Sequence, residues 1–144
     1  MAKMYHVTVR QHFDAAHALR GYMGRCERLH GHRFEVAVTL SGDRLNDIGI
    51  LYDFSELKGH LKEVLSRLDH FSLNEVPPFD SQNPSSENLA RFVYGELKVR
   101  LGVDAGLLAQ VRVWESPEAW AVYEESPPRG DFGRVLKETR PLVP

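Results

Sequence analysis

Sixteen residues in the first quarter of the chain read His17-Ala-Leu-Arg-Gly-Tyr-Met-Gly-Arg-Cys26-Glu-Arg-Leu-His30-Gly-His32. They contain three of the seven histidines and the single cysteine of the sequence. Alternating apolar residues flank them on both sides. We therefore interpret them as a long connection between two β-strands, with chemically active side chains gathered at its two ends.

The alternation on both sides predicts strands, because successive side chains of a strand point to opposite faces. In the first strand, His17 shares its face with the apolar residues Tyr5, Val7, Val9, Phe13 and Ala15. In the second strand, His30 and His32 begin a stripe that continues through Phe34, Val36, Val38 and Leu40. If the strands pair antiparallel, the end of the first lies beside the start of the second, and the three imidazoles converge.

This convergence predicts a metal site. Two imidazoles at positions i and i+2 of a strand have roots about 6.5 Å apart, from which both rings reach one ion. Three neutral imidazoles with an open fourth position are typical of catalytic zinc, whereas four protein ligands are typical of structural zinc. Cys26 is able to complete the tetrahedron, so both alternatives stay open. The metal-free alternative, three half-buried histidines bonded to polar neighbours, is less favoured because a third histidine and a cysteine accompany the His-x-His pair.

Length and composition predict one domain. A chain of 144 residues with 42% hydrophobic content is long enough to bury a core of ordinary size. We expect a single domain over 1–125 and a Pro/Gly-rich tail over 126–144. A net charge of -2 and a pI near 6.4 argue against nucleic acid or an anionic membrane as the main partner. The N-terminus has no apolar signal region and no run could span a bilayer, so we expect a cytoplasmic protein.

The rest of the chain predicts two helices and two further strands. The first helix begins after a cap at Asp53 and has the apolar stripe Phe54, Leu57, Leu61, Val64, Leu65 and Leu68. The second begins near Ser85 or Ser86, ends at Gly102 and has the stripe Leu89, Phe92, Val93, Leu97 and Leu101. A strand through Val111, Val113 and Glu115 and another over 120–124 follow. We expect an α+β fold, a four-stranded antiparallel sheet with two helices on one face, in the order ββααββ.

From about Tyr5 to Tyr123 the chain resembles the 6-pyruvoyl-tetrahydropterin synthase and 6-carboxytetrahydropterin synthase family. The motifs that carry the resemblance are Phe13-Asp-Ala-Ala-His17, Cys26-Glu-Arg-Leu-His30-Gly-His32, Tyr52-Asp-Phe-Ser-Glu-Leu-Lys58, Leu68-Asp-His-Phe-Ser-Leu-Asn74, Asn83-Pro-Ser-Ser-Glu-Asn-Leu89 and Val113-Trp-Glu-Ser116. The resemblance implies the tunnel-type fold (T-fold), in which trimers close their sheets into a barrel. Two trimers would stack into a homohexamer, with active sites at the subunit interfaces.

The resemblance also implies chemical roles. Zn²⁺ would be held by the three histidines of the opening stretch. Cys26 would be the base that removes a carbon-bound proton, and Asp69 with His70 would move protons as an acid-base pair. From position alone, His70 is better explained as a charge that complements the carbonyl end of a helix.

Two glutamates are expected to bind the substrate. Glu115 ends an apolar stripe, and from the residues alone a solvent-facing strand end is as plausible as a recognition group. A pterin presents a ring N–H beside an amine, two parallel donors that one carboxylate accepts, and the resemblance implies that Glu115 anchors this ring. It also places Glu87 with the substrate, although an acid in the first turn of a helix is explained by the helix dipole.

The implied substrate is 7,8-dihydroneopterin triphosphate. The bacterial branch of the family makes 6-carboxy-5,6,7,8-tetrahydropterin, acetaldehyde and triphosphate for queuosine and 7-deazaguanine synthesis, and the animal branch makes the 6-pyruvoyl compound. Three residues separate Cys26 from His30, a short spacing that resembles the bacterial branch. We expect a zinc-dependent lyase, a 6-carboxytetrahydropterin synthase, with the 6-pyruvoyl enzyme as the alternative. A non-enzymatic zinc module, with Cys26 as fourth ligand, is the alternative of another class.

Overall fold

The structure, a computed structural model, describes residues 3–125. Over these residues, four long strands and two α-helices follow one another in the predicted order ββααββ. The predicted tail over 126–144 lies outside the described residues. No helix among residues 3–125 is long and apolar enough to cross a membrane.

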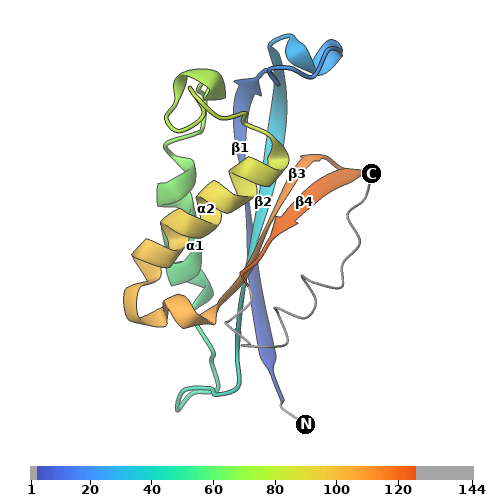
Figure 1. Ribbon diagram of the computed structural model, residues 1–144. Coiled ribbons are helices and arrows are strands. Elements are labelled where there is room, and N and C mark those ends of the chain that lie inside the picture. The colour runs from blue at the N-terminus through green and yellow to red at the C-terminus, as the bar shows by residue number, and fades with distance from the viewer. Residues whose placement is uncertain (1–2, 126–144) are drawn as a thin grey trace, which may run out of the picture.

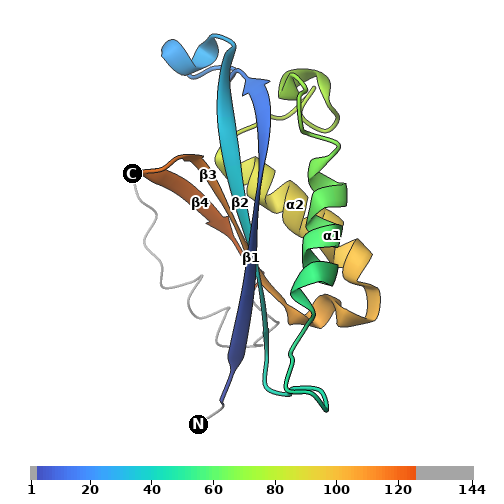
Figure 2. The ribbon, with the colours of Figure 1, turned by 180° about the vertical axis from the view of Figure 1, so that it is seen from behind.

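The strands form one antiparallel sheet in the order β1-β2-β3-β4. They are β1 (Tyr5–His17), β2 (His30–Gly42), β3 (Leu108–Ser116) and β4 (Ala119–Tyr123). The first two are the longest and project beyond β3 and β4 toward the loop that joins them (Figures 1 and 2). Since the order of strands in the sheet follows the sequence, β1 and β4 are the two edges.

Both helices cover the same face of the sheet (Figure 1). Helix α1 (Phe54–Leu65) begins at Asp53, whose carboxylate accepts the N–H of Ser55 as the predicted cap. Helix α2 (Ser86–Leu101) is capped by Ser85 and ends at Gly102, whose φ of 57° suits a residue without a Cβ. The remaining elements are the short 3-10 helices η1 (Arg25–Glu27), η2 (Leu73–Glu75) and η3 (Gly102–Leu107).

The core lies between this sheet face and the helices. It contains Phe13, Phe34, Val36, Val38, Leu40, Val111 and Val113 from the strands and Leu57, Leu61, Leu89, Val93 and Leu97 from the helices. The predicted stripe of α1 was wrong at its two ends. Phe54 is 54% exposed, and Leu68 is buried but lies beyond the last residue of the helix. A turn over 66–69 carries Leu68 into the core, which periodicity alone does not show.

The register of the first two strands confirms the predicted convergence. His17 pairs with His30, and Ala15 pairs with His32, at the end of the sheet next to the loop. His17 shares the core face of β1 with Phe13, which its spacing of four residues requires. The three imidazoles therefore meet at the rim of the hydrophobic core.

Candidate functional site

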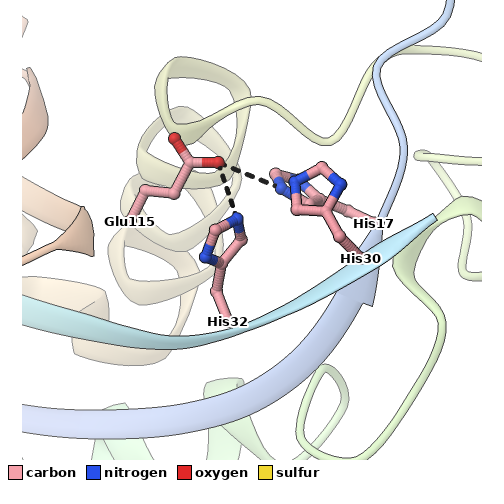
Figure 3. A group of neighbouring side chains, drawn as sticks. All are labelled: His17, His30, His32 and Glu115. Carbon is pink, nitrogen blue, oxygen red and sulfur yellow. Dashed lines mark hydrogen bonds and ion pairs between the residues drawn. The ribbon is translucent and has the colours of Figure 1, made fainter. Parts of the chain in front are cut away.

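Three imidazoles and one carboxylate meet at this rim (Figure 3). His17, His30, His32 and Glu115 each offer a ligand atom, and these atoms lie within 4.8 Å of one another. The ring centroids of the histidines are 4.6 to 5.1 Å apart, and each pair of rings packs edge to face. The sequence predicted the three histidines as a set, and the structure brings them together.

Backbone carbonyls fix the orientation of two of the rings. The Nδ1–H of His17 donates to the carbonyl of Pro84 at 2.7 Å, and the Nδ1–H of His30 donates to the carbonyl of Arg28 at 2.7 Å. A carbonyl accepts and never donates, so Nδ1 carries the proton in both rings. In the neutral tautomer the lone pair is then on Nε2, the nitrogen that remains free for an ion.

Glu115 brings negative charge against two of these nitrogens. Its Oε1 lies 3.1 Å from Nε2 of His17 and 3.0 Å from Nε2 of His32, whereas Oε2 points away from the rings (Figure 3). A lone pair that faces a carboxylate is unfavourable unless a proton or a cation lies between them. The arrangement at His17 therefore suits a bound cation.

His32 provides a further sign of a cation site. Its Nε2 is inaccessible to solvent and has no hydrogen-bond partner within the described chain, despite its closeness to Glu115. Buried polar atoms of folded proteins nearly always have a partner. Burial also lowers the pKa of His32, an effect larger than the opposing attraction of Glu115. His32 thus favours the neutral form that a metal requires.

These donors fit zinc. Zn–N and Zn–O bonds of about 2.0 to 2.1 Å in a tetrahedron place ligand atoms about 3.3 Å apart. The contacts of 3.0 and 3.1 Å between Glu115 and the two histidines are slightly shorter than that. Three imidazole nitrogens with a fourth position left to water or substrate are also the ligand set of catalytic zinc rather than of a thiolate-rich structural centre.

Cys26 lies in η1, within the loop that joins β1 to β2. Cys26 is partly buried, and its backbone carbonyl accepts the N–H of Leu19 at 2.7 Å. Within residues 3–125, the group whose ligand atoms lie within 4.8 Å of one another contains Glu115 and not the thiol of Cys26. The geometry therefore favours a centre formed without the thiol over a four-ligand centre that includes it.

Asp69 and His70 form a second group, at the edge of the sheet. Nδ1 of His70 lies 3.0 Å from Asp69 Oδ2, an ion-pair distance when the imidazole is protonated, so the two residues do contact each other. Asp14 joins them, and the ligand atoms of the three residues lie within 4.8 Å of one another. Asp14 is three residues before His17 on β1, so its side chain faces the opposite side of the strand. Within one chain, the Asp69–His70 pair and the three histidines are separated by β1.

Glu87 is exposed in the first turn of α2. It lies three residues after Pro84, the residue whose carbonyl orients His17. Glu87 is thus one helical turn from a backbone group that contacts His17, but none of the described hydrogen bonds involves its side chain.

Sequence reasoning missed the residues that hold the loop after His17. The side chain of Asn74 both donates to and accepts from the backbone of Ala18, at 2.9 and 2.8 Å. Asn83 does the same to the backbone of Arg20, at 2.9 and 2.8 Å. Each asparagine stands at an end of a motif that carried the family resemblance, which was a usable signal. Asp14 and Pro84 also lie inside such motifs.

Comparisons with known proteins agree with this geometry. The model of the family described as 6-pyruvoyl tetrahydropterin synthase matches residues 6–126. The chain is 40% identical over 91 residues to 6-carboxy-5,6,7,8-tetrahydropterin synthase of Synechocystis sp., covering 60% of this chain and 69% of that protein. It is 35% identical over 119 residues to the enzyme of the same name from Bacillus subtilis, covering 78% of this chain and 80% of that protein.

A solved structure shows the same fold. The 6-pyruvoyl tetrahydropterin synthase of Caenorhabditis elegans superposes with a TM-score of 0.80 at 27% sequence identity. The superposition covers 86% of this chain and 97% of that one. The predicted T-fold is therefore confirmed.

Proposed function

The chain belongs to the 6-pyruvoyl tetrahydropterin synthase family, and we propose that it converts 7,8-dihydroneopterin triphosphate to 6-carboxy-5,6,7,8-tetrahydropterin, acetaldehyde and triphosphate. The chain is thus an enzyme, a tetrahydropterin synthase of the lyase type. The observation that carries the proposal is the convergence of three imidazoles, two of them oriented by backbone carbonyls, beside a carboxylate.

The three histidines would hold Zn²⁺, whose contribution is to polarise the hydroxyls of the substrate side chain as a Lewis acid. Cys26, in the loop above the histidines, acts on the substrate as a thiolate that removes the proton from the adjoining carbon. Its absence from the four-residue cluster supports this division of labour, because a base must remain free to move a proton.

Asp69 and His70 move the protons that the shift of the double bond into the ring requires. Asp69 Oδ2 lies beside Nδ1 of His70 at 3.0 Å, which leaves Nε2 to exchange protons with the substrate. His70 is 77% exposed, so another molecule can reach its ring.

Since the pair lies on the opposite side of β1 from His17, we propose that the pair of one copy serves the metal of another. Homo-oligomerisation would bring them together. Among residues 3–125, β1 and β4 are the edge strands of the sheet, and large apolar side chains are exposed at Tyr5, Ile48 and Phe54. A homohexamer built from two trimers, as the resemblance implies, would cover these edges.

Glu115 would bind the pterin ring, with Glu87 as a second contact. Oε1 of Glu115 faces the histidines and Oε2 faces away from them. A ring N–H and amine side by side would be accepted by both oxygens after a small rotation of the carboxylate. With its ring bound to Glu115, the pterin would point its side chain toward the three histidines.

The carboxy product is favoured over the pyruvoyl product by two bacterial relatives with that name and by the short Cys26–His30 spacing. We place the reaction in queuosine and 7-deazaguanine synthesis in the cytoplasm. The test is incubation of the zinc-loaded protein with 7,8-dihydroneopterin triphosphate and identification of the products. Acetaldehyde with 6-carboxytetrahydropterin is expected. A pyruvoyl product without acetaldehyde would establish the alternative, and zinc binding without turnover would favour the non-enzymatic zinc module.

A further inference from the structure

Beside the Asp69–His70 pair lies an ion pair between β1 and β2, formed by Asp14 and Arg33. We propose that Asp14 is a positioning residue, whose backbone holds the Asp69–His70 pair against β1, and that Arg33 balances the charge of the Asp14 carboxylate beside that pair. The proposal rests on the acid-base role proposed above for Asp69 and His70.

Two hydrogen bonds and one ion-pair contact link Asp14, Asp69 and His70. The backbone N–H of His70 donates to the carbonyl of Asp14 at 2.6 Å, and the backbone N–H of Asp14 donates to Asp69 Oδ1 at 2.9 Å. The other carboxylate oxygen of Asp69 lies 3.0 Å from Nδ1 of His70. One residue of β1 thereby fixes both members of the pair, and the two oxygens of Asp69 serve different partners.

The backbone of His70 has a φ of 65°. A residue with a Cβ adopts this conformation at a cost, and it persists where the surrounding structure enforces it. Here the next residues are bound to β1 as well: the N–H of Ala16 donates to the carbonyl of Phe71 at 3.1 Å, and Ala16 forms a parallel bridge with Ser72. The strained turn thus holds an exposed imidazole at one place on an edge strand.

Charge also links Asp14 to the Asp69–His70 pair. The carboxylates of Asp14 and Asp69 and the imidazole of His70 lie within 4.8 Å of one another. Two unbalanced carboxylates favour a protonated imidazole strongly. Arg33 opposes this, because its Nε lies 3.1 Å from Asp14 Oδ1 and its Nη2 lies 3.5 Å from Oδ2.

Arg33 also holds the pKa of Asp14 below its ordinary value, so that carboxylate stays ionised and paired. The other charged neighbour of the two carboxylates is His12 of β1. With Arg33 present, the charge of Asp14 is offset, and Asp69 remains the immediate partner of His70.

This arrangement predicts shifts of opposite sign. In R33Q the carboxylate of Asp14 is unbalanced, so His70 holds its proton to higher pH. In D14N the cation of Arg33 is unbalanced, so His70 loses its proton at lower pH. At low ionic strength we expect each shift to be about half a pH unit, decreasing with added salt. The double variant should return close to the wild type, because both charges are removed.

The experiment follows the NMR titration of the His70 ring in the zinc-loaded, full-length protein, with the signal assigned through H70Q. The pH–rate profile is measured on the same variants. Their zinc content checks that His32, the residue next to Arg33, still binds zinc. The matched control is K98Q, which breaks the ion pair between Lys98 of α2 and Glu125. The side chains of Lys98 and Glu125 are 55% and 42% exposed, similar to the 61% and 41% of Arg33 and Asp14.

Opposite shifts in the single variants, with K98Q unchanged, would support the proposal. Equal midpoints in all variants, or shifts of the same sign in R33Q and D14N, would overturn it. The NMR titration needs no substrate, so it decides the proposal even if the wild type fails to turn over the pterin. That failure would count against the proposed function alone.

Discussion

His17 Nε2 lies 3.1 Å from Glu115 Oε1, although 98 residues separate them in the sequence. The order of the sheet explains this closeness. Strands β1 and β3 flank β2 and both run antiparallel to it, so their carboxyl ends lie at the same end of the sheet. His17 is the last residue of β1, and Glu115 is the last but one of β3. Any sequence that forms this sheet with core-facing residues at both positions brings the two side chains together.

Removal of the Glu115 charge should separate pterin binding from metal binding. We expect E115Q to keep zinc and to raise KM about 10- to 100-fold, since a charge-assisted bidentate contact contributes about 1.5 to 3 kcal/mol. The matched variant is H32Q, which should lose zinc because it removes an imidazole ligand. Zinc content by metal analysis and steady-state kinetics check both. Loss of zinc in E115Q would instead show that the carboxylate holds the metal.

Cys26 should be dispensable for the metal and necessary for turnover. Because its thiol stands outside the four-residue cluster, we expect C26A to bind zinc and fold like the wild type while kcat falls at least about a hundredfold, as for loss of a general base. Zinc content, thermal unfolding and product formation are measured side by side. Loss of zinc together with loss of fold in C26A would support a structural site.

The convergence of the three histidines was predictable from the sequence because it follows local rules. The alternation of β1 and β2 set the face of each side chain, and the antiparallel pairing set the meeting of His17 with His30 and His32. The helices and strands were likewise predictable from periodicity and capping signals, except where the chain turns into the core at Leu68 after the end of α1.

What the sequence did not show depends on contacts between distant segments. The hydrogen bonds of Asp14 to Asp69 and His70 join β1 to the turn after α1, and 55 residues separate Asp14 from Asp69. The carbonyl of Pro84 orients His17 across 67 residues. Backbone groups are the same at every position, so residue type gives no sign of which carbonyl will meet a histidine.

Acid should weaken the contribution of Asp69 to stability. The backbone N–H of Asp14, followed by the imidazole of His70, holds the pKa of Asp69 below its ordinary value of 3.8. The folded state therefore prefers the ionised form, and this contribution is complete above that value and is lost as the pH falls through the folded-state pKa. We expect the difference in unfolding free energy between wild type and D69N to shrink as the pH falls below about 4.

Chemical denaturation at a series of pH values measures this difference. The low pKa of Glu125, which is set by Tyr123 and Lys98, is common to both proteins and cancels in the difference. A difference that does not change with pH would mean that the ionised form of Asp69 has no preference for the folded state.

The loop anchor at Asn74 should influence the metal from a distance. Its two hydrogen bonds hold the backbone of Ala18, the residue directly after the ligand His17. We expect N74A to lower the unfolding free energy by about 1 to 3 kcal/mol, since two backbone groups lose a partner, and to weaken zinc binding about tenfold. The matched control is N46A, because the side chain of Asn46 accepts two backbone N–H groups in the exposed turn before α1. N46A should lower stability and leave zinc affinity unchanged. Competition titration with a chelator measures zinc affinity, and denaturation measures stability. Equal zinc affinity in N74A and wild type would show that His17 keeps its place without this anchor.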